Sequence, residues 1–316
     1  MNTHKWGLVL SGGGGKGSYQ LGVYRALIET GLFSCINGIS GTSIGAINAA
    51  LFAMNNYDNA LKAWSSIKPD LFLSPITITS AQIPDIITQN VITHALDNGI
   101  FSRSGLEKLL NDYVDFNRLS ACPYAIYANA VTGTLPGERV RYFALNDRTP
   151  SLIKQIILAS SALPYIYEPV EIEGELYRDG GLLDNVPVKP LVELGLKHII
   201  VVRLEEDEHI PLSYKDSADY IDIEPSREIG DFTNGTIDFN AKHINMRLEL
   251  GYRDALRAIR HYKLKQAGTP VRDADRIAEE EADFIMIKNT FKKEELQESI
   301  DSHMNTLNNI LGKYGF

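Results

Sequence analysis

A glycine-rich segment near the start of the chain has the composition of a backbone anion site. Residues 10–22 read LSGGGGKGSYQLG, and five of the six residues from 12 to 17 are glycine, the sixth being Lys16. The segment lies between an apolar run, residues 6–10, and a stretch with helical spacing of apolar residues. A glycine loop that opens a helix exposes backbone N–H groups at the positive end of the helix dipole, so it favours a bound negative charge.

The nucleotide-binding motifs do not fit this loop. Its Gly-x-Gly-x-x-Gly spacing matches the dinucleotide fingerprint, which also requires an acidic residue at the end of the second strand to hold the ribose. The predicted second strand, residues 36–40, is followed by Gly-Thr-Ser and no carboxylate. A P-loop registered on Lys16 requires glycine at Leu10 and a hydroxyl at Gly17, and has neither. A purely structural turn remains the alternative, although five glycines cost more entropy than such a turn requires.

The second reactive segment is GTSIG, residues 41–45, which fits Gly-x-Ser-x-Gly. This pattern is typical of a sharp strand-to-helix turn that projects the Ser43 hydroxyl, with Gly41 and Gly45 relieving the crowding. A short apolar strand before it and a small-residue helix after it, residues 44–54, supply the context, although the bare pattern also arises by chance. An ordinary α/β-hydrolase places several strands before this serine, whereas only 42 residues precede Ser43.

A serine hydroxyl is a weak nucleophile and needs a base within hydrogen-bonding reach. Histidine is the usual base, but none of the seven histidines sits in a motif-like setting, and each is interpreted as solvated or structural. They are His4, His94, His198, His209, His243, His261 and His303.

The better candidate base lies in YRDGGLLDNVPV, residues 177–188. Asp179 follows a short strand-like stretch and precedes two glycines, so its carboxylate sits at a strand end. An aspartate acts as a base only when it is partly desolvated or matched to the serine by a short hydrogen bond. A plain Asp-Gly turn is the alternative. Asp184 and Asn185 are nearby candidates that we interpret as turn or supporting residues.

The composition excludes several classes of partner. The chain has 316 residues, of which 44% are hydrophobic and 22% charged, and its net charge of -9 argues against nucleic acid and against adhesion to an anionic membrane. Cys35 and Cys122 form no paired motif, and the short apolar run at the start is unlike a signal peptide, so we expect a cytoplasmic location. Residues 31–57 are uncharged but contain several Asn, Gly and Ser, which indicates buried core. No His, Cys or carboxylate cluster has metal-ligand spacing, and no cofactor or metal is expected.

The elements that position these segments follow a simple order. A strand at 6–10, a helix at 18–30, a strand at 36–40 and a helix at 44–54 predict a parallel sheet with helices on its faces. Residues 71–96 are apolar and interpreted as buried packing, with an acyl-channel border or a lid as the alternative. The later predicted elements are an amphipathic helix at 104–116, two pairing strands at 124–132 and 140–145, a helix at 152–159, a strand at 198–204, and helices at 240–263 and 293–313.

Four segments resemble the patatin-like phospholipase family, in its order and spacing across about residues 7–204. They are LSGGGGKGSYQLGV (10–23), GTSIGA (41–46), ASSALPYIYEPV (159–170) and DGGLLDNVPV (179–188). The segment INMRLELGYRDALRAI, residues 244–259, is similar to a C-terminal helix of bacterial members. One small departure is Asp184, which stands where many members have Asn.

The resemblance implies a three-layer α/β/α fold with a central, mostly parallel sheet and additional C-terminal helices. With no repeat or linker in view, we expect one domain over residues 1–316, with its core at about 7–204 and helices at about 240–316. The resemblance also implies a Ser-Asp dyad in which Ser43 is the nucleophile and Asp179 the base. Backbone N–H groups of Gly13, Gly14 and Gly15 would hold the oxyanion. The residues implied to shape the motifs are Gly12, Lys16, Gly17, Gly41, Gly45, Gly180 and Gly181.

The implied activity is hydrolysis of fatty-acyl esters of lipids, of phospholipase A or lysophospholipase type, through an acyl-enzyme. The implied partner is a lipid or phospholipid substrate at a membrane or micelle surface, with the protein cytoplasmic or peripheral on the membrane. A lipid transacylase and a non-catalytic lipid-binding module are the alternatives. The oligomeric state is left open.

Overall fold

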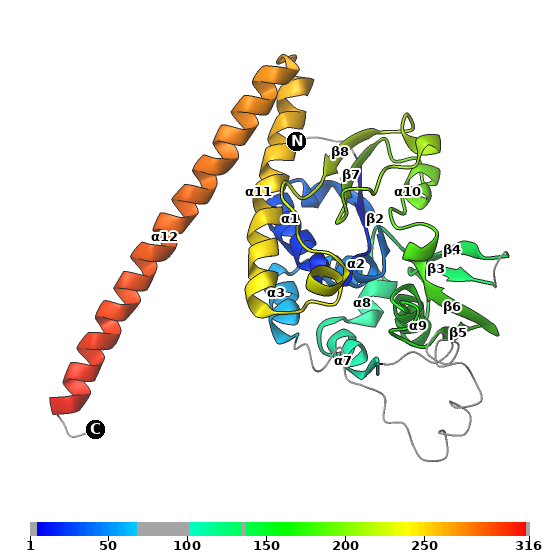
Figure 1. Cartoon of the computed structure of the whole chain (residues 1–316), viewed down its shortest axis with the longest axis horizontal. Coiled ribbons are helices and arrows are strands. Elements are labelled where there is room, and N and C mark those ends of the chain that lie inside the picture. Colours follow the sequence, from blue (N-terminus) through cyan, green and yellow to red (C-terminus); the bar gives the residue numbers. More distant parts are fainter. Residues whose placement is uncertain (1–4, 68–100, 134–136, 314–316) are drawn as a thin grey trace. The chain divides into compact units, whose positions relative to one another are not determined.

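In the part of the chain that the structure describes, the strands form one eight-stranded sheet with the first strand near its middle. The computed structural model describes residues 5–67, 101–133 and 137–313. β1 (Trp6–Leu10) is buried along its whole length and pairs in parallel with β2 (Ile36–Thr42) and with β7 (His198–Val202). β8 (Asp219–Ile223) extends the parallel set beyond β7. The alternation of short apolar strands and helices in the sequence predicted these central parallel strands of the sheet (Figure 1).

β3 (Ala125–Thr132) joins the parallel strands to an antiparallel group. β4 (Arg139–Ala144) pairs antiparallel along one side of β3, as predicted, and two strands share the other side. β2 runs parallel to β3 up to the pair Thr42–Asn129, and β6 (Glu175–Asp179) runs antiparallel from the pair Asp179–Ala130. β5 (Val170–Ile172) pairs with β6. Because Asn129 and Ala130 are neighbours, the carboxyl ends of β2 and β6 meet at one point of the sheet.

Helices cover both faces of the sheet. α2 (Ile44–Ala53) and α9 (Pro150–Ser160) pack on one face, and α10 (Lys189–Glu193) packs on the other. The pleat of β2 shows the separation, because Gly38 faces Leu191 of α10 whereas Gly41, three residues later, faces Gly45 of α2. The three-layer α/β/α arrangement with a mostly parallel sheet is therefore confirmed.

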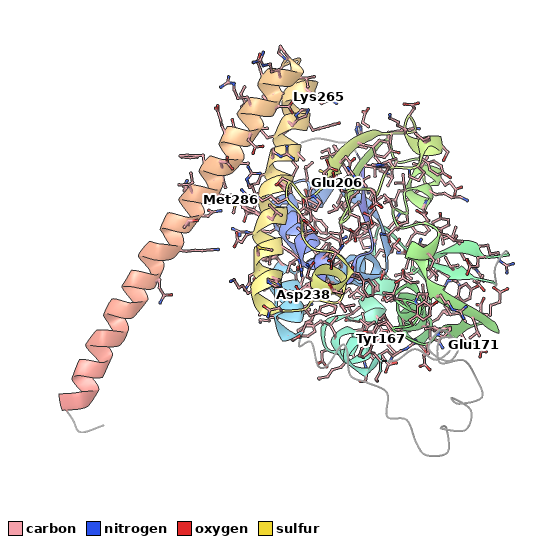
Figure 2. The ribbon with its side chains drawn as sticks, in the orientation of Figure 1. Tyr167, Glu171, Glu206, Asp238, Lys265 and Met286 are labelled. Carbon is pink, nitrogen blue, oxygen red and sulfur yellow. The ribbon has the colours of Figure 1, made fainter. Side chains whose placement is uncertain are left out.

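α1 (Ser18–Glu29) lies beside the glycine loop and ends before Gly31, whose φ of 77° is the left-handed value expected of a helix stop. α11 (Ala241–Gln266) packs against α1, since Tyr19 donates a hydrogen bond to Asp254 at 3.0 Å and the Tyr252 hydroxyl bonds to Glu29. Figure 2 draws the side chains on the same ribbon, with Asp238 on the segment before α11 and Tyr167 on the segment after α9.

Three predicted boundaries need correction. The helix expected at 104–116 is two helices, α7 (Ser104–Tyr113) and α8 (Phe116–Ser120), because the Asp115 carboxylate accepts the N–H groups of Asn117 and Arg118 and starts a new helix. β2 extends to Thr42, two residues beyond the prediction, because it pairs with β3 to that point. The last helix, α12 (Val271–Lys313), begins well before residue 293. Among the described residues, α3 (Tyr57–Ser66) is a further helix. The predicted stretch 71–96 lies outside the described residues.

The chain divides into two compact units, residues 1–255 and 256–316. In the second unit, the end of α11 and the start of α12 are joined by the ion pair of Arg260 with Glu281 at 2.8 Å and by a contact of His261 with Asp275 at 2.6 Å. Within the described ranges, none of the helices combines the length and the apolar character needed to cross a bilayer. The organisation of residues 1–316 as one domain stays a prediction.

Candidate active site

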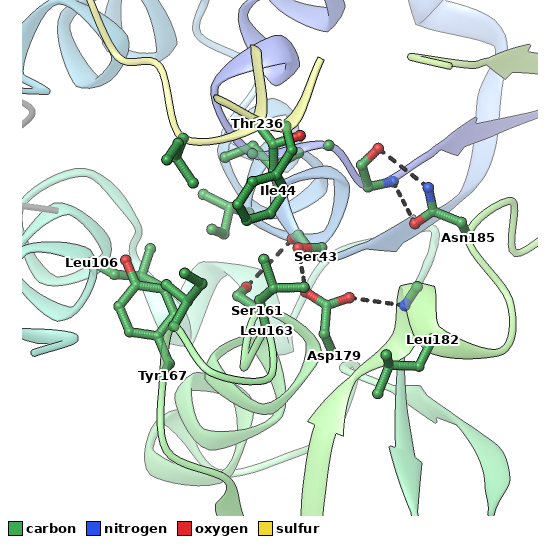
Figure 3. Close-up of a pocket in the computed structure, with 18 of the residues that line it drawn as sticks. Ser43, Ile44, Leu106, Ser161, Leu163, Tyr167, Asp179, Leu182, Asn185 and Thr236 are labelled. Carbon is green, nitrogen blue, oxygen red and sulfur yellow. Dashed lines mark hydrogen bonds between the residues drawn. The ribbon is translucent and has the colours of Figure 1, made fainter. Parts of the chain in front are cut away.

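Ser43 and Asp179 are in direct contact where β2 and β6 end. Ser43 Oγ donates a hydrogen bond of 2.6 Å to Asp179 Oδ2, between residues 136 positions apart in the sequence (Figure 3). Ser43 directly follows β2, and Asp179 is the last residue of β6. The two residues that the sequence singled out separately are therefore brought together by the register of β2 and β6 on β3.

Ser43 lies on a sharp strand-to-helix turn, as the Gly-x-Ser-x-Gly spacing predicts. Its φ of 55° and ψ of -122° are unusual for a residue with a side chain and cost roughly 1–3 kcal/mol. The flanking positions leave no room for side chains: a Cβ on Gly41 would lie 2.3 Å from the Gly45 carbonyl oxygen, and one on Gly45 2.2 Å from that of Leu10. The Ser43 N–H donates to Ser160 Oγ at 2.9 Å, which ties the turn to the end of α9.

Asp179 is buried, with 3% of its surface exposed. Burial raises the pKa of its carboxyl to about 6, while the hydrogen bonds from Ser43 and from the Gly181 N–H oppose that rise. The Gly181 N–H reaches Asp179 Oδ1 at 2.8 Å, so the second oxygen of the carboxylate is held while Oδ2 faces the serine. Gly180 is buried and begins the short turn that carries this N–H. A carboxylate whose pKa lies near neutrality is a better proton acceptor than an ordinary aspartate.

The glycine loop presents its backbone to the same place. The N–H of Gly12 is taken by Asn185 Oδ1 at 3.1 Å, and that of Lys16 by the Gly13 carbonyl at 3.1 Å. In the described part of the chain, the N–H groups of Gly13 and Gly14 have no protein acceptor, and both residues line the cavity that contains Ser43. Gly15 is buried and is not among the lining residues. Of the three predicted oxyanion glycines, the structure thus brings two to the cavity.

Two side chains, those of Lys16 and Asn185, fix the position of the glycine loop. Lys16 is buried and pairs with Glu205, beyond the end of β7, so its charge is already neutralised. Asn185 accepts from the Gly12 N–H and donates to the Gly12 carbonyl at 3.4 Å (Figure 3). It also donates to Glu208. Asn185 has the supporting place that the sequence suggested, whereas Glu208 carried no recognisable signal. Gly17 closes the short helical turn of residues 14–17 against the side of α2.

Ser43 and Asp179 line a cavity of about 260 Å³ whose walls are mostly apolar. Figure 3 shows Leu106, Leu163 and Tyr167 around the two polar side chains. No histidine of the described residues lines the cavity. The apolar lining residues are Ile44, Ile47, Leu106, Leu163, Ile166, Tyr167, Leu182, Phe232, Ile237 and Phe239. A cavity of this kind accepts an apolar chain while its polar end meets the Ser43 hydroxyl.

Comparison with known proteins identifies the family. The family model for patatin-like phospholipases matches residues 8–192, which is more than half of the chain. The chain belongs to the patatin-like phospholipase family. This patatin-like core contains the glycine loop, Ser43, Asp179 and Asn185.

Individual relatives are distant from this patatin-like chain. Lysophospholipase NTE1 of Kluyveromyces lactis is 29% identical over 215 residues, and that of Saccharomyces cerevisiae is 28% identical over 215 residues; each alignment covers 67% of this chain. The aligned part is only 13% and 11% of those proteins, respectively. Among solved structures, VipD from Legionella pneumophila aligns over 98% of this chain and 80% of its own, with 18% identity and a TM-score of 0.48.

Part of the cavity comes from outside the patatin-like match. Phe232, Thr236, Ile237 and Phe239 line it, and all four follow residue 192. They belong to a segment before α11 that had no recognisable motif and that sequence reasoning missed. Ser160 lies in a segment that resembles the family, but nothing in the sequence predicted its hydrogen bond to the Ser43 N–H.

Proposed function

We propose that this chain hydrolyses fatty-acyl esters of lipids, in the manner of a phospholipase A or lysophospholipase, with Ser43 as nucleophile and Asp179 as base. The observation that supports the proposal most is the 2.6 Å hydrogen bond between Ser43 and Asp179 in an apolar cavity. Membership of the patatin-like family and the lysophospholipase relatives support the lipid substrate class.

In the first half of the proposed reaction, Ser43 Oγ attacks the ester carbonyl carbon and its proton passes to Asp179 Oδ2. The carbonyl oxygen becomes an oxyanion that accepts hydrogen bonds from the N–H groups of Gly13 and Gly14, with Gly15 behind them. Amide donors placed in this way lower the barrier by about 3 kcal/mol each. The tetrahedral intermediate collapses, the alcohol leaves with the proton from Asp179, and the acyl group stays on Ser43.

In the second half, Asp179 accepts a proton from water as the water oxygen attacks the acyl-enzyme. A second oxyanion forms in the same place and collapses to the fatty acid, and the proton returns to Ser43. These steps consist of proton transfers and of attack by two successive nucleophiles, Ser43 Oγ and water, so the proposal requires no metal or cofactor. A Ser-Asp pair replaces the usual triad because the buried carboxylate, with its raised pKa, does the work that histidine does elsewhere.

The mouth of the cavity supports action at the surface of a membrane or micelle. Leu182 and Phe232 line the cavity and are also 43% and 51% exposed, so they lie where it opens to solvent. Leu183, which follows Leu182 in the chain, is 49% exposed. Exposed apolar side chains around an opening favour contact with lipid, and the net charge of -9 favours an uncharged or zwitterionic surface over an anionic one. The proposal keeps the cytoplasmic location predicted from the sequence, with peripheral attachment to such a surface.

A fluorophosphonate probe tests the nucleophile. We expect covalent labelling of the wild-type chain and none of Ser43→Ala. Asp179→Asn should fold and lose turnover by about 10⁴-fold, because the serine proton has no acceptor. The matched control is Asp184→Asn, since Asp184 bonds to Tyr142 and does not line the cavity; it should keep its activity. Labelling that persists in Ser43→Ala, or normal turnover by Asp179→Asn, would contradict the proposal.

Product analysis separates the alternatives. Release of free fatty acid from a defined phospholipid is expected of a hydrolase, whereas a transacylase transfers the acyl group to an added alcohol in preference to water. A non-catalytic lipid-binding module would bind the lipid and release nothing, and a folded wild type that takes no label would favour that reading.

A further inference from the structure

Arg247 is a buried arginine that has no role in the proposed reaction steps. It lies on α11, outside the family match, with 1% of its surface exposed. Its guanidinium donates to the carbonyl oxygens of Ile229 at 3.0 Å, Asn234 at 2.6 Å and Asp238 at 3.1 Å. It also pairs with Asp238 Oδ2 at 2.8 Å. A buried guanidinium needs such partners, and here all of them belong to one stretch, residues 229–239, called the wall segment below.

The wall segment has an uncommon backbone form. Residues 232–236 make a π-helical turn, a form that is rare and frequent at functional sites. Asp231 and Asn234 cap each other's backbone N–H groups at its start. At its end, Asp238, labelled in Figure 2, accepts from His243 Nδ1 at 2.6 Å as well as from Arg247. Arg247 thus bonds to carbonyl groups before, within and after the turn.

The backbone of the wall segment packs directly against the backbone of the glycine loop. A Cβ on Gly14 would lie 2.1 Å from the Thr236 carbonyl oxygen, and a Cβ on Gly15 would lie 2.1 Å from that of Asp238. Neither distance is possible for a real side chain, so the two backbones are in contact with nothing between them. A displacement of the wall segment therefore displaces the loop that carries the Gly13 and Gly14 N–H groups, or leaves it unsupported.

The wall segment also borders the space for substrate. Phe232, Ile237 and Phe239 line the cavity that contains Ser43. One stretch of chain, fixed by one buried arginine, thus touches both the N–H donors and the apolar wall.

We propose that Arg247 is a positioning residue: by holding the wall segment against Gly14 and Gly15, it fixes the Gly13 and Gly14 N–H groups where the oxyanion forms. The inference rests on the proposed function, because it concerns the same reaction. Hydrogen-bond donors that move by a fraction of an ångström lose more in the transition state than in the bound ester. The loss on removing Arg247 should therefore fall mainly on kcat.

The test compares Arg247→Met and Arg247→Lys with the wild type on a water-soluble p-nitrophenyl butyrate substrate. We expect kcat to fall roughly tenfold to a hundredfold in Arg247→Met, with a much smaller change in KM. Arg247→Lys keeps the positive charge but has fewer hydrogen-bond donors. Its kcat should lie between those of Arg247→Met and the wild type. The matched control is Tyr252→Phe, which removes a bond from the same helix to Glu29 at the end of α1, outside the wall segment, and should keep its kcat.

Thermal melting identifies the variants that fold. If Arg247→Met does not fold, Asp238→Asn decides the matter, because it removes the ion pair and leaves the Asp238 carbonyl in place; it should lower kcat in the same direction. An unchanged kcat in a folded Arg247→Met or, failing that, in Asp238→Asn would overturn the positioning role. Absence of fluorophosphonate labelling in the wild type is a different failure, since it contradicts the proposed function itself.

Discussion

Two neighbouring turns of this protein share an unusual backbone angle, but one places glycine there and the other places a residue with a side chain. Gly14 follows β1 and Ser43 follows β2, and both have a φ of 55°. At Gly14 the absence of a side chain is obligatory, since Thr236 occupies the place of a Cβ. At Ser43 the chain accepts the strain and keeps the side chain. In the proposed reaction, the first turn supplies backbone N–H groups, whereas the second supplies a hydroxyl.

The difference shows where strain is tolerated in this fold. A peptide N–H needs no side chain, so glycine supplies it without steric cost. A nucleophile must be a side chain, so its turn carries strain of roughly 1–3 kcal/mol that the surrounding sheet and helices maintain. Substitutions at the two positions should therefore impair the protein in different ways, and four experiments test this contrast.

Among these comparisons of the two turns, Gly14→Ala has the largest expected effect. The new Cβ would collide with the Thr236 carbonyl and take a φ that alanine avoids, so the N–H groups beside it would shift. We expect kcat on a short-chain ester to fall about a hundredfold, as for the loss of an oxyanion donor. Gly31→Ala is the matched control, because Gly31 also has positive φ but nothing within 4 Å of its Cβ position. Equal activity of the two variants would contradict the assignment of the loop.

A smaller effect is expected from pH. The Ser43 turn depends directly on a titrating partner, since Asp179 must be ionised to accept the proton. With its pKa raised to about 6, kcat/KM should fall tenfold for each pH unit below that value. Gly14→Ala should keep the same midpoint, because amides do not titrate. A rate that is flat between about pH 5 and 8 would exclude Asp179 as the base with this pKa.

The contribution of Asp179 to the stability of the fold should decrease as pH rises, whereas the rate should increase. The pKa of Asp179 is higher in the folded chain than its ordinary value of 3.8, so folding favours the protonated form. The stabilisation is complete below the ordinary pKa and is lost as pH rises through about 6. Asp179→Asn should weaken this dependence in urea titrations without abolishing it, because burial also raises the pKa of Asp184.

The smallest effect is expected from Ser43→Gly compared with Ser43→Ala. Both lack the hydroxyl and should be inactive, so they differ only in how well they accept the backbone angle. Glycine should be more stable by about 1 kcal/mol, because it has no Cβ to strain. Urea unfolding measures the difference. Greater stability of the alanine variant would mean that the turn relaxes when the hydroxyl is gone.

The sequence predicted those parts of the site that depend on residue type. Ser43 and Asp179 could be selected because few side chains supply a nucleophile or a base, and glycines cluster where backbones must come close. Their contact could not be predicted from the segments themselves. It follows from the register on β3, where Thr42 lies opposite Asn129 and Asp179 opposite Ala130.

The wall segment was not predictable for a physical reason. Thr236 and Asp238 meet the glycine loop through carbonyl oxygens, which every residue possesses, so no residue type marks the contact. Arg247 stands in a polar helical stretch, where arginine is ordinarily a surface residue. The start of α12 was missed similarly, because its first turns are rich in Ala, Asp and Glu and have little apolar periodicity.

The meeting of β2 and β6 on β3 has a consequence for biosynthesis. A ribosome releases the chain from its amino end, so the strand that carries Ser43 emerges long before the strand that carries Asp179, 136 positions later. Contacts between residues so far apart in sequence form late in folding. A nascent chain that stops short of Asp179 therefore holds the proposed nucleophile without its base, and one that stops short of Arg247 lacks the anchor of the wall segment. The proposed lipid-cleaving activity would therefore arise only after most of the first unit has been made.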